Sequence, residues 1–276
     1  MKIDERLVGE VIRIAKMAGQ ELLDIYNAQS PLDIRTKQDN SPVTLADLRA
    51  HDIILKNLSL LTPEVPLLSE EDPDFSFDIR KTWSQYWLVD PLDGTREFIE
   101  RSGQFTVNIA LIENSVPVLG VIFVPLKNLL YFAAKGLGSF KAEGEGEAIA
   151  LSIREWHPGD EIVLVATRRE LHEELQGLLL AQGNLKLTYR SSSLKFCMIA
   201  EGLGDIYLRK ARIHEWDTGA GQCIVEQASG VVLDLNWEAL RYNTRSHLLN
   251  PPFIAVGDSK QLLPLLKLMP MFKEIN

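Results

Sequence analysis

Two helical patterns mark the first sixty residues of the chain. Apolar side chains recur there at steps of three and four, which predicts an amphipathic helix over residues 3–26, with a buried face made of Ile3, Leu7, Val8, Val11, Ile14, Ala15, Ala18 and Leu22. A second helix is predicted to begin at Thr44, because threonine is a good N-cap residue and Asp47 follows three positions later. We expect Leu48, Leu55 and Leu58 on its buried face.

The middle of the chain changes to the short apolar runs that are typical of β-strands. These runs cover residues 65–68, 86–89, 105–112, 116–124 and 129–134. The turn-like Glu113-Asn114-Ser115 between two of them predicts a β-hairpin. Glycines between residues 136 and 146 predict a loop-rich stretch, and we place a domain boundary near residue 150.

The second half of the chain alternates between the two patterns. Strands are predicted at residues 162–166, 185–189, 206–208, 231–235 and 253–256. Helices are predicted at residues 170–182, 193–202, 217–228 and 259–268. Such alternation is typical of an α/β layer. The sequence therefore predicts an α+β domain over residues 1–150 and an α/β domain over residues 151–276.

Composition narrows the class of protein. The chain has 276 residues, of which 46% are hydrophobic, and this fraction excludes a disordered chain. The uncharged stretch Asn114–Leu126 is too short to span a bilayer, and charged residues at positions 4–6 interrupt any secretory signal. Two cysteines cannot form a disulfide framework, so we expect a reducing, cytoplasmic location. A net charge of −9 argues against nucleic acid as a partner.

Acidic residues follow directly after two of the predicted strands. Leu68 is followed by Ser69-Glu70-Glu71, and Val89 is followed by Asp90-Pro91-Leu92-Asp93-Gly94-Thr95. Ligands collect at the carboxyl ends of strands in layered α/β folds. A tight turn lets Asp90 and Asp93 point to one spot, beside free amides at a helix start. Hard carboxylates next to such amides suit Mg²⁺ together with a phosphate.

A third motif, Trp216-Asp217-Thr218-Gly219-Ala220-Gly221, opens a helix of small residues that permits close approach to a ligand. Taken alone, Asp217 would be an N-cap residue. Together, the three motifs resemble the signatures of the inositol monophosphatase superfamily, with Gly219 where alanine is usual. The resemblance implies a layered αβαβα sandwich and a Mg²⁺-dependent, lithium-sensitive phosphomonoesterase.

Within that superfamily, the chain is most similar to the bacterial 3′(2′),5′-bisphosphate nucleotidases. The similarity rests on residues 39–47, 69–73, 86–90, 97–99, 105–112 and 192–197, with Arg96 where lysine is common. It implies removal of the 3′-phosphate from adenosine 3′,5′-bisphosphate, a by-product of sulfate activation. It also implies an enzyme that is cytoplasmic or peripheral at the inner face of the membrane. Whether the chain is a monomer or a homodimer stays open.

The resemblance also implies ligands for two or three Mg²⁺ ions. One ion would be held by Glu70, Asp90 and the Leu92 carbonyl, a second by Asp90, Asp93 and Asp217, and a third, weaker one by Glu70. Four carboxylates this close together would repel one another without cations.

Asp47 and Thr95 are implied to polarise the attacking water, although a capping-box acid is the structural alternative for Asp47. The amides of Gly94 and Thr95 would hold the phosphate. Glu71 is either an orienting residue or a solvated charge.

Substrate recognition is assigned by the same resemblance to Ser192, Lys195 and Arg209, with Glu70, Leu92, Asp93, Gly94, Thr95 and Asp217 also touching substrate. A second phosphate needs a second cationic site, which Lys195 and Arg209 supply. Both could instead be solvated charges. Arg168 and Arg169 are further candidates.

Three other functions compete with this one. Hydrolysis of inositol monophosphate or of a sugar phosphate belongs to the same superfamily. A haloacid-dehalogenase-type phosphatase spaces its two aspartates two residues apart, whereas Asp90 and Asp93 are three apart. A non-catalytic binding protein would not need the complete set of ligands together with the Asp47–Thr95 pair.

Overall fold

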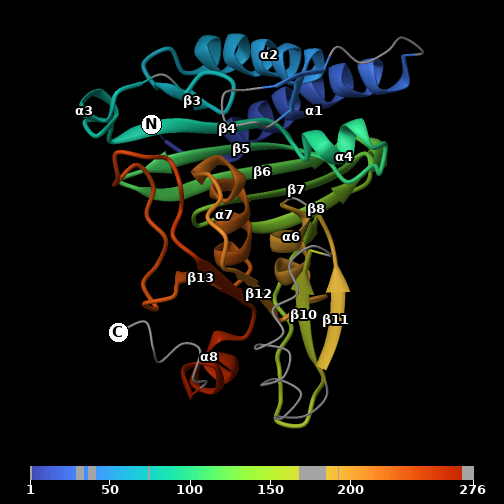
Figure 1. Ribbon diagram of the computed structural model, residues 1–276, viewed down its shortest axis with the longest axis vertical. Helices are drawn as coiled ribbons and strands as arrows, with labels where there is room; N and C mark the ends of the chain where they lie inside the picture. Colours follow the sequence, from blue (N-terminus) through green and yellow to red (C-terminus); the bar gives the residue numbers. More distant parts are fainter. Residues whose placement is uncertain are drawn as a thin grey trace.

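The structure is a computed structural model that describes residues 2–28, 34–36, 42–73, 75–167, 185–191 and 193–268. These residues form five stacked layers (Figure 1). Helices α1 and α2 cover one face of a seven-stranded sheet, and α6 and α7 separate that sheet from a five-stranded one. Helix α8 lies on the outer face of the second sheet. This αβαβα order confirms the expected fold.

The outer helices are α1 (Glu5–Asn27) and α2 (Leu45–Leu61). Helix α1 begins after Asp4, whose carboxylate accepts the amide of Leu7 at 3.0 Å and caps the helix. Helix α2 begins after Thr44, as predicted. A two-stranded sheet, β1 (Ile34–Thr36) with β2 (Pro42–Thr44), precedes α2.

The prediction for the buried face of α2 was partly wrong. Leu58 is buried and Leu55 is half-buried, but Leu48 is 37% exposed. The buried apolar stripe instead follows Ala46, Ala50, Ile54 and Leu58 at steps of four. In the first half of the helix, Ala46 and Ala50 face the core and Leu48 points outward.

The first sheet has the order β3-β4-β5-β6-β7-β8-β9, and only β3 and β4 pair in parallel. Its strands are β3 (Leu67–Ser69), β4 (Gln85–Asp93), β5 (Thr106–Glu113), β6 (Val116–Val124), β7 (Leu129–Ala134), β8 (Gly138–Glu143) and β9 (Ile149–Ala150). The predicted hairpin between β5 and β6 is confirmed, with Asn114 and Ser115 both at positive φ. Helices bury both faces of the central strands, which explains their continuous apolar runs.

The prediction of loops between residues 136 and 146 was wrong in its centre. Residues 138–143 form strand β8, which pairs with β7 along its whole length. The ring of Phe140 stacks on that of Phe132, with centroids 5.3 Å apart. Pairing and this stack outweigh the low strand propensity of the nearby glycines.

The second sheet has the order β11-β10-β12-β14-β13. Its strands are β10 (Ile162–Ala166), β11 (Leu185–Tyr189), β12 (Ile206–Arg209), β13 (Val231–Asp234) and β14 (Phe253–Val256). The remaining elements are α3 (Phe77–Arg80), α4 (Thr95–Ile99), η1 (Pro125–Lys127), α6 (Leu194–Ala200), η2 (Glu215–Asp217), α7 (Gly219–Gln227) and α8 (Ser259–Leu268). The helix predicted over residues 170–182 lies outside the described residues.

Helix α7 packs directly on the first sheet. A Cβ atom at Gly219 would lie 3.1 Å from Leu88 Cδ2 and 3.2 Å from the Cβ of Ala110, so glycine permits this approach. Because α7 belongs to the second half of the chain, the core between the sheets is shared by both halves. The domain boundary near residue 150 stays a prediction; β9 ends the first sheet at that point.

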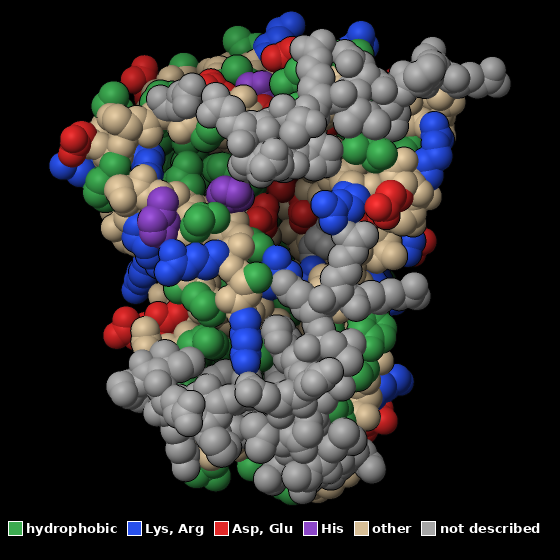
Figure 2. Space-filling model, viewed as in Figure 1, with side chains coloured by type: hydrophobic (Ala, Val, Ile, Leu, Met, Phe, Trp, Pro, Cys, Tyr) green, Lys and Arg blue, Asp and Glu red, His purple; other side chains and the backbone are tan. Residues whose placement is uncertain are grey.

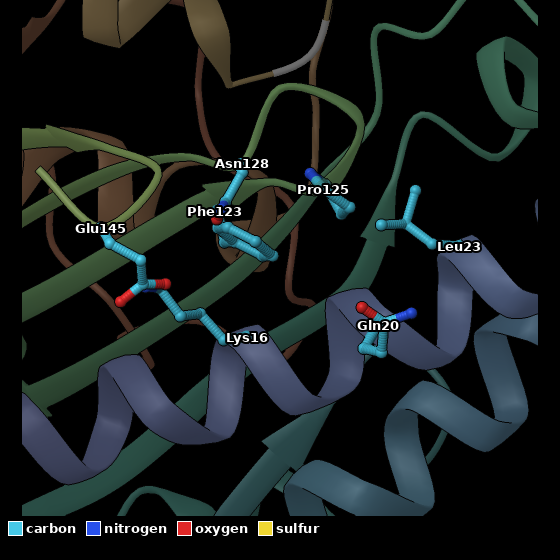
Figure 3. Close-up of a pocket in the computed structure, with 7 residues that line it drawn as sticks. All are labelled: Lys16, Gln20, Leu23, Phe123, Pro125, Asn128 and Glu145. Carbon is cyan, nitrogen blue, oxygen red and sulfur yellow. The ribbon is translucent and has the colours of Figure 1, made fainter.

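The opposite face of the first sheet carries a shallow pocket of about 280 Å³ beside α1. Figure 3 shows Lys16 and Gln20 of α1 facing Phe123 and Asn128 across it. The Lys16 ammonium lies 3.9 Å from the carboxylate of Glu145. Within the described residues, no helix is both long and apolar enough to cross a bilayer.

Candidate active site

The acids that follow the strands become neighbours through the parallel pairing of β3 and β4. Ser69 is in register with Val89, and the amide of Glu70 donates to the Val89 carbonyl at 3.1 Å. This places Glu70 beside Asp90. Strand β4 continues through Asp90 to Asp93, with an irregular register against β5 between them. Glu70 and both aspartates therefore lie at one edge of the sheet.

Asp217 reaches the same edge from the second half of the chain. It ends η2 rather than capping α7, whose N-cap is Thr218, so the N-cap interpretation was wrong. Its carboxylate instead accepts the amide of His214 at 2.9 Å. Because η2 is a single turn of 3₁₀ helix, the Asp217 side chain folds back toward His214 at the start of that turn.

Burial and mutual repulsion dominate the electrostatics of these acids. Asp90 is 1% exposed, and burial raises the pKa of its carboxyl well above the usual range, with Glu70, Asp93 and Asp217 adding to the effect. The pKa of Asp217 is raised by burial first, then by Asp93 and Glu70. The Asp90 carboxylate accepts the backbone amide of Leu92 at 3.0 Å.

Asp93 is fixed by two polar residues that sequence reasoning did not assign a role. Its Oδ2 accepts from the Ser193 amide at 2.8 Å, the Ser193 hydroxyl at 2.7 Å and the Asn108 side chain at 3.2 Å. The Ser193 hydroxyl also lies 3.1 Å from the Asp217 carbonyl. Both residues fall inside the stretches that carried the resemblance, but their contacts exist only once β5, α6 and η2 meet.

Asp47 and Thr95 meet although they are 48 positions apart. The Thr95 hydroxyl donates to Asp47 Oδ1 at 3.1 Å and lies 3.4 Å from the Leu92 carbonyl. Asp47 Oδ2 accepts from the amide and the hydroxyl of Thr44, each at 2.7 Å, which completes a capping box. The two interpretations of Asp47 are thus compatible, because each concerns a different carboxylate oxygen.

Gly94 makes the turn between β4 and α4. Its φ of 97° and ψ of 43° are left-handed, a conformation that glycine adopts without steric cost. The turn brings the Thr95 side chain to Asp47 and starts a short helix at the pocket. Glu71 is half-buried, and its amide lies 3.4 Å from the Ser69 hydroxyl.

A pocket of about 240 Å³ opens beside the acids. It is lined by Asp93, Gly94, Glu97, Thr167, Lys195, Phe196, Tyr207, Arg209, Ile213 and Asp217. In Figure 2, acidic side chains lie in a hollow near the middle of the visible face, with basic side chains around it. The structure therefore brings three carboxylates, of Asp93, Glu97 and Asp217, and two cations, of Lys195 and Arg209, to one cavity.

Lys195 is only 4% exposed, and its ammonium lies 5.1 Å from the ring centre of Tyr207. It is not the solvated helix charge of the alternative interpretation. Thr167 and Tyr207 are lining residues that lie outside the sequence motifs, and Glu97 lies in one of the motifs but was given no role. Ser192, Arg168 and Arg169 lie outside the described residues.

The chemistry of this donor set fits a hard divalent cation. Glu70, Asp90, Asp93, Asp217 and the Leu92 carbonyl offer only oxygen atoms, the ligands that Mg²⁺ prefers. The raised pKa values of Asp90 and Asp217 indicate negative charge that the surrounding groups do not balance. Within the described ranges, no three His, Cys, Asp or Glu side chains are already grouped as a cation site.

This imbalance predicts how stability depends on pH and metal. An acid whose pKa is raised in the folded state costs stability as the pH rises from its unfolded pKa through its folded pKa. In a chelator, we therefore expect the Tm to fall as the pH is raised from 5 to 8. Mg²⁺ at about a hundred times its Kd should add about 2.7 kcal/mol, which corresponds to roughly 5–10 °C.

Thermal unfolding with EDTA or with Mg²⁺ across this pH range measures both effects. The gain from Mg²⁺ should grow with pH, because the ion binds the deprotonated carboxylates. A Tm that rises with pH in EDTA, or that does not respond to Mg²⁺ at pH 8, would contradict the prediction.

Comparison with known proteins gives a consistent result. The family model for the inositol monophosphatase family matches residues 4–265. The chain is 42% identical over 247 residues to the 3′(2′),5′-bisphosphate nucleotidase CysQ of Escherichia coli, which covers 90% of this chain and 98% of that protein. The CysQ protein of Haemophilus influenzae is 36% identical over 260 residues, which covers 94% and 95%.

A solved structure agrees with these relatives. CysQ from Bacteroides thetaiotaomicron, described as a bacterial member of the inositol monophosphatase family, superposes with a TM-score of 0.78 at 38% identity. The superposition covers 92% of this chain and 97% of that one. The family model spans all three acidic motifs, and the structure brings these motifs to one edge of the first sheet. On these grounds the chain belongs to the inositol monophosphatase family.

Proposed function

We propose that the chain is a 3′(2′),5′-bisphosphate nucleotidase that removes the 3′-phosphate of adenosine 3′,5′-bisphosphate. One observation carries the proposal: Lys195 and Arg209 line the same pocket as Asp93 and Asp217. A substrate with two phosphates needs one cationic site beyond the reacting centre, and these two side chains supply it. Relatives named as bisphosphate nucleotidases, which align over most of this chain, support the same substrate class.

The family is metal-dependent, and Glu70, Asp90, Asp93, Asp217 and the Leu92 carbonyl are the residues that would hold Mg²⁺. When bound, the ion would act as a Lewis acid toward the phosphate and balance the charge that develops on the leaving oxygen. The amides of Gly94 and Thr95 would donate to the phosphate oxygens at the start of α4.

Asp47 and Thr95 would handle the proton of the attacking water. The Thr95 hydroxyl donates to Asp47 Oδ1, which leaves the Thr95 oxygen free to accept from the water. Burial raises the pKa of Asp47, while its bonds from Thr44 and Thr95 act in the opposite direction. As the water oxygen bonds to phosphorus, the ester P–O bond breaks and its electron pair stays on the 3′-oxygen, which takes a proton from solvent, while the proton of the attacking water passes toward Asp47.

A panel of substrates tests the proposal. The purified chain should release phosphate from adenosine 3′,5′-bisphosphate with Mg²⁺, and Li⁺ should inhibit the release. The panel should also include the sulfated nucleotide, NADP-type compounds, inositol monophosphate and fructose bisphosphate. Much faster turnover of inositol monophosphate than of the bisphosphate nucleotide would overturn the proposal.

Arg209 should distinguish one phosphate from two. We expect Arg209→Gln to raise the KM for adenosine 3′,5′-bisphosphate by about 10- to 100-fold, because a charged hydrogen bond contributes about 1.5–3 kcal/mol. The KM for adenosine 3′-monophosphate should change much less. Lys210→Gln is the matched control, since Lys210 is exposed and next in sequence. Equal losses on both substrates would remove Arg209 from the second phosphate site.

A further inference from the structure

A buried ionic cluster includes Glu215, which starts the turn that Asp217 ends, and it joins the two halves of the chain. Arg80, at the end of α3, is 2% exposed, and Glu215, at the start of η2, is fully buried. Arg245 Nη1 lies 3.9 Å from Glu215 Oε1. Burying charges is costly unless they are paired and held by hydrogen bonds, so such a cluster needs a structural or functional reason.

Hydrogen bonds tie the members of the cluster together. Arg80 Nη1 donates to Asn243 Oδ1 at 2.6 Å, and its Nη2 donates to the carbonyls of Arg245 and Ser246 at 2.9 and 2.6 Å. The backbone N–H of Asn243 donates to Glu215 Oε2 at 2.8 Å. Arg80 is thus hydrogen-bonded to the loop at residues 243–246, and that loop is hydrogen-bonded to Glu215.

The second carboxylate oxygen of Glu215, Oε1, is held by electrostatic attraction and by no hydrogen bond within the described residues. Glu215 Oε1, Arg80 Nε and Arg245 Nη1 are all buried and make no hydrogen bond with the described part of the chain. Glu215 interacts electrostatically with both guanidinium groups. A neutral side chain of the same shape at position 215 would therefore lose the attraction that holds it between the two arginines.

The backbone after Glu215 is held just as firmly. The Thr218 hydroxyl donates to the Glu215 carbonyl at 3.0 Å. The same hydroxyl oxygen accepts from Tyr242 at 3.0 Å and from Asn250 at 2.7 Å. Asp217 lies inside this turn, so we expect a shift of Glu215 to move the Asp217 carboxylate.

The four acids come from both halves of the chain, and this suggests a function for the clamp that Arg80 and Arg245 form around Glu215. Glu70, Asp90 and Asp93 come from the first half of the chain, and Asp217 comes from the second. We propose that Glu215 is a positioning residue that, clamped by Arg80 and Arg245, sets Asp217 at the correct distance from the other three acids. The proposal rests on the proposed function only in that it takes the four acids as the ligands of Mg²⁺.

Titration of Mg²⁺ against thermal stability tests the role without any substrate. Glu215→Gln should raise the Mg²⁺ concentration needed for a given Tm gain by about 10- to 100-fold, because residues that orient metal ligands have effects of this size. Arg245→Gln should shift it in the same direction by less, since Arg245 is partly exposed. If Glu215→Gln does not fold, Arg245→Gln carries the test.

A matched control is Asp205→Asn. Asp205 is also a buried acid; it directly precedes β12, is bound to Arg154, and has no bond to η2 among the described residues. The Asp205→Asn variant should have a lower Tm in EDTA, but the Mg²⁺ concentration needed for a given Tm gain should stay unchanged. A wild-type concentration requirement in Glu215→Gln, or an equal shift in Asp205→Asn, would overturn the clamp. Failure of the wild type to release phosphate from the bisphosphate would instead overturn only the proposed substrate.

Discussion

Replacing Asp90 by asparagine should lower kcat/KM for adenosine 3′,5′-bisphosphate by about a thousandfold, or about 4 kcal/mol. Asp90 is the most buried of the four acids and interacts with the other three. Asparagine keeps the shape of the side chain but removes its charge, so cation binding and charge balance both suffer. Phosphate release at saturating Mg²⁺ measures the loss.

Stability should change in the opposite direction in the same variant. In EDTA, Asp90→Asn removes a buried charge from a repulsive cluster, so the variant should unfold at a higher temperature than the wild type at pH 8. Asp78→Asn is the control, because Asp78 is exposed and its partner Lys81 is half-exposed. A near-normal turnover of Asp90→Asn would remove Asp90 from the reacting centre.

Removing the Thr95 hydroxyl should lower kcat by about 10²- to 10⁴-fold, the range for losing a positioned proton acceptor. Thr95→Val keeps the shape of the side chain and loses the bond to Asp47 Oδ1. Asp47→Asn should have a similar effect, and the double variant should be little worse than either single one, because the two groups act as a unit. Thr95→Ser should restore most of the rate.

The two functions of Asp47 can be separated with Thr44. Thr44→Ala removes the cap of α2 and should cost about 0.5–2 kcal/mol of stability. It leaves the Thr95 contact in place, so kcat should fall far less than in Thr95→Val. If Thr44→Ala lost as much kcat as Thr95→Val, Asp47 would act through the helix cap alone.

Local patterns were enough for most secondary structure. The hairpin of β5 and β6 followed from Asn114 and Ser115 between two apolar runs, and α2 followed from Thr44 and Asp47. The errors have a common cause. Both depend on packing between segments. Strand β8 is stabilised by pairing with β7 and by the stack of Phe140 on Phe132, and Leu48 is exposed because α2 packs through Ala46, Ala50, Ile54 and Leu58 instead.

The candidate site shows the same division between sequence and structure. Asp90 and Asp93 lie in one motif, so their closeness was visible in the sequence. The residues that hold Asp93 were not visible in the sequence. Asn108 and Ser193 are 85 positions apart, and they contact Asp93 only when β5 meets α6. The pairing of Arg80 with the loop at residues 243–246, about 165 positions away, is a further example.

By itself, the sequence determined the kinds of element, their order and the three acidic motifs, because period, caps and turn residues act within a few positions. The tertiary structure decided which acids became neighbours, which oxygen of Asp47 faced Thr95 and which charges were buried behind Asp217. These outcomes depend on desolvation and on distances between segments far apart in the chain, and neither quantity exists until the layers have packed.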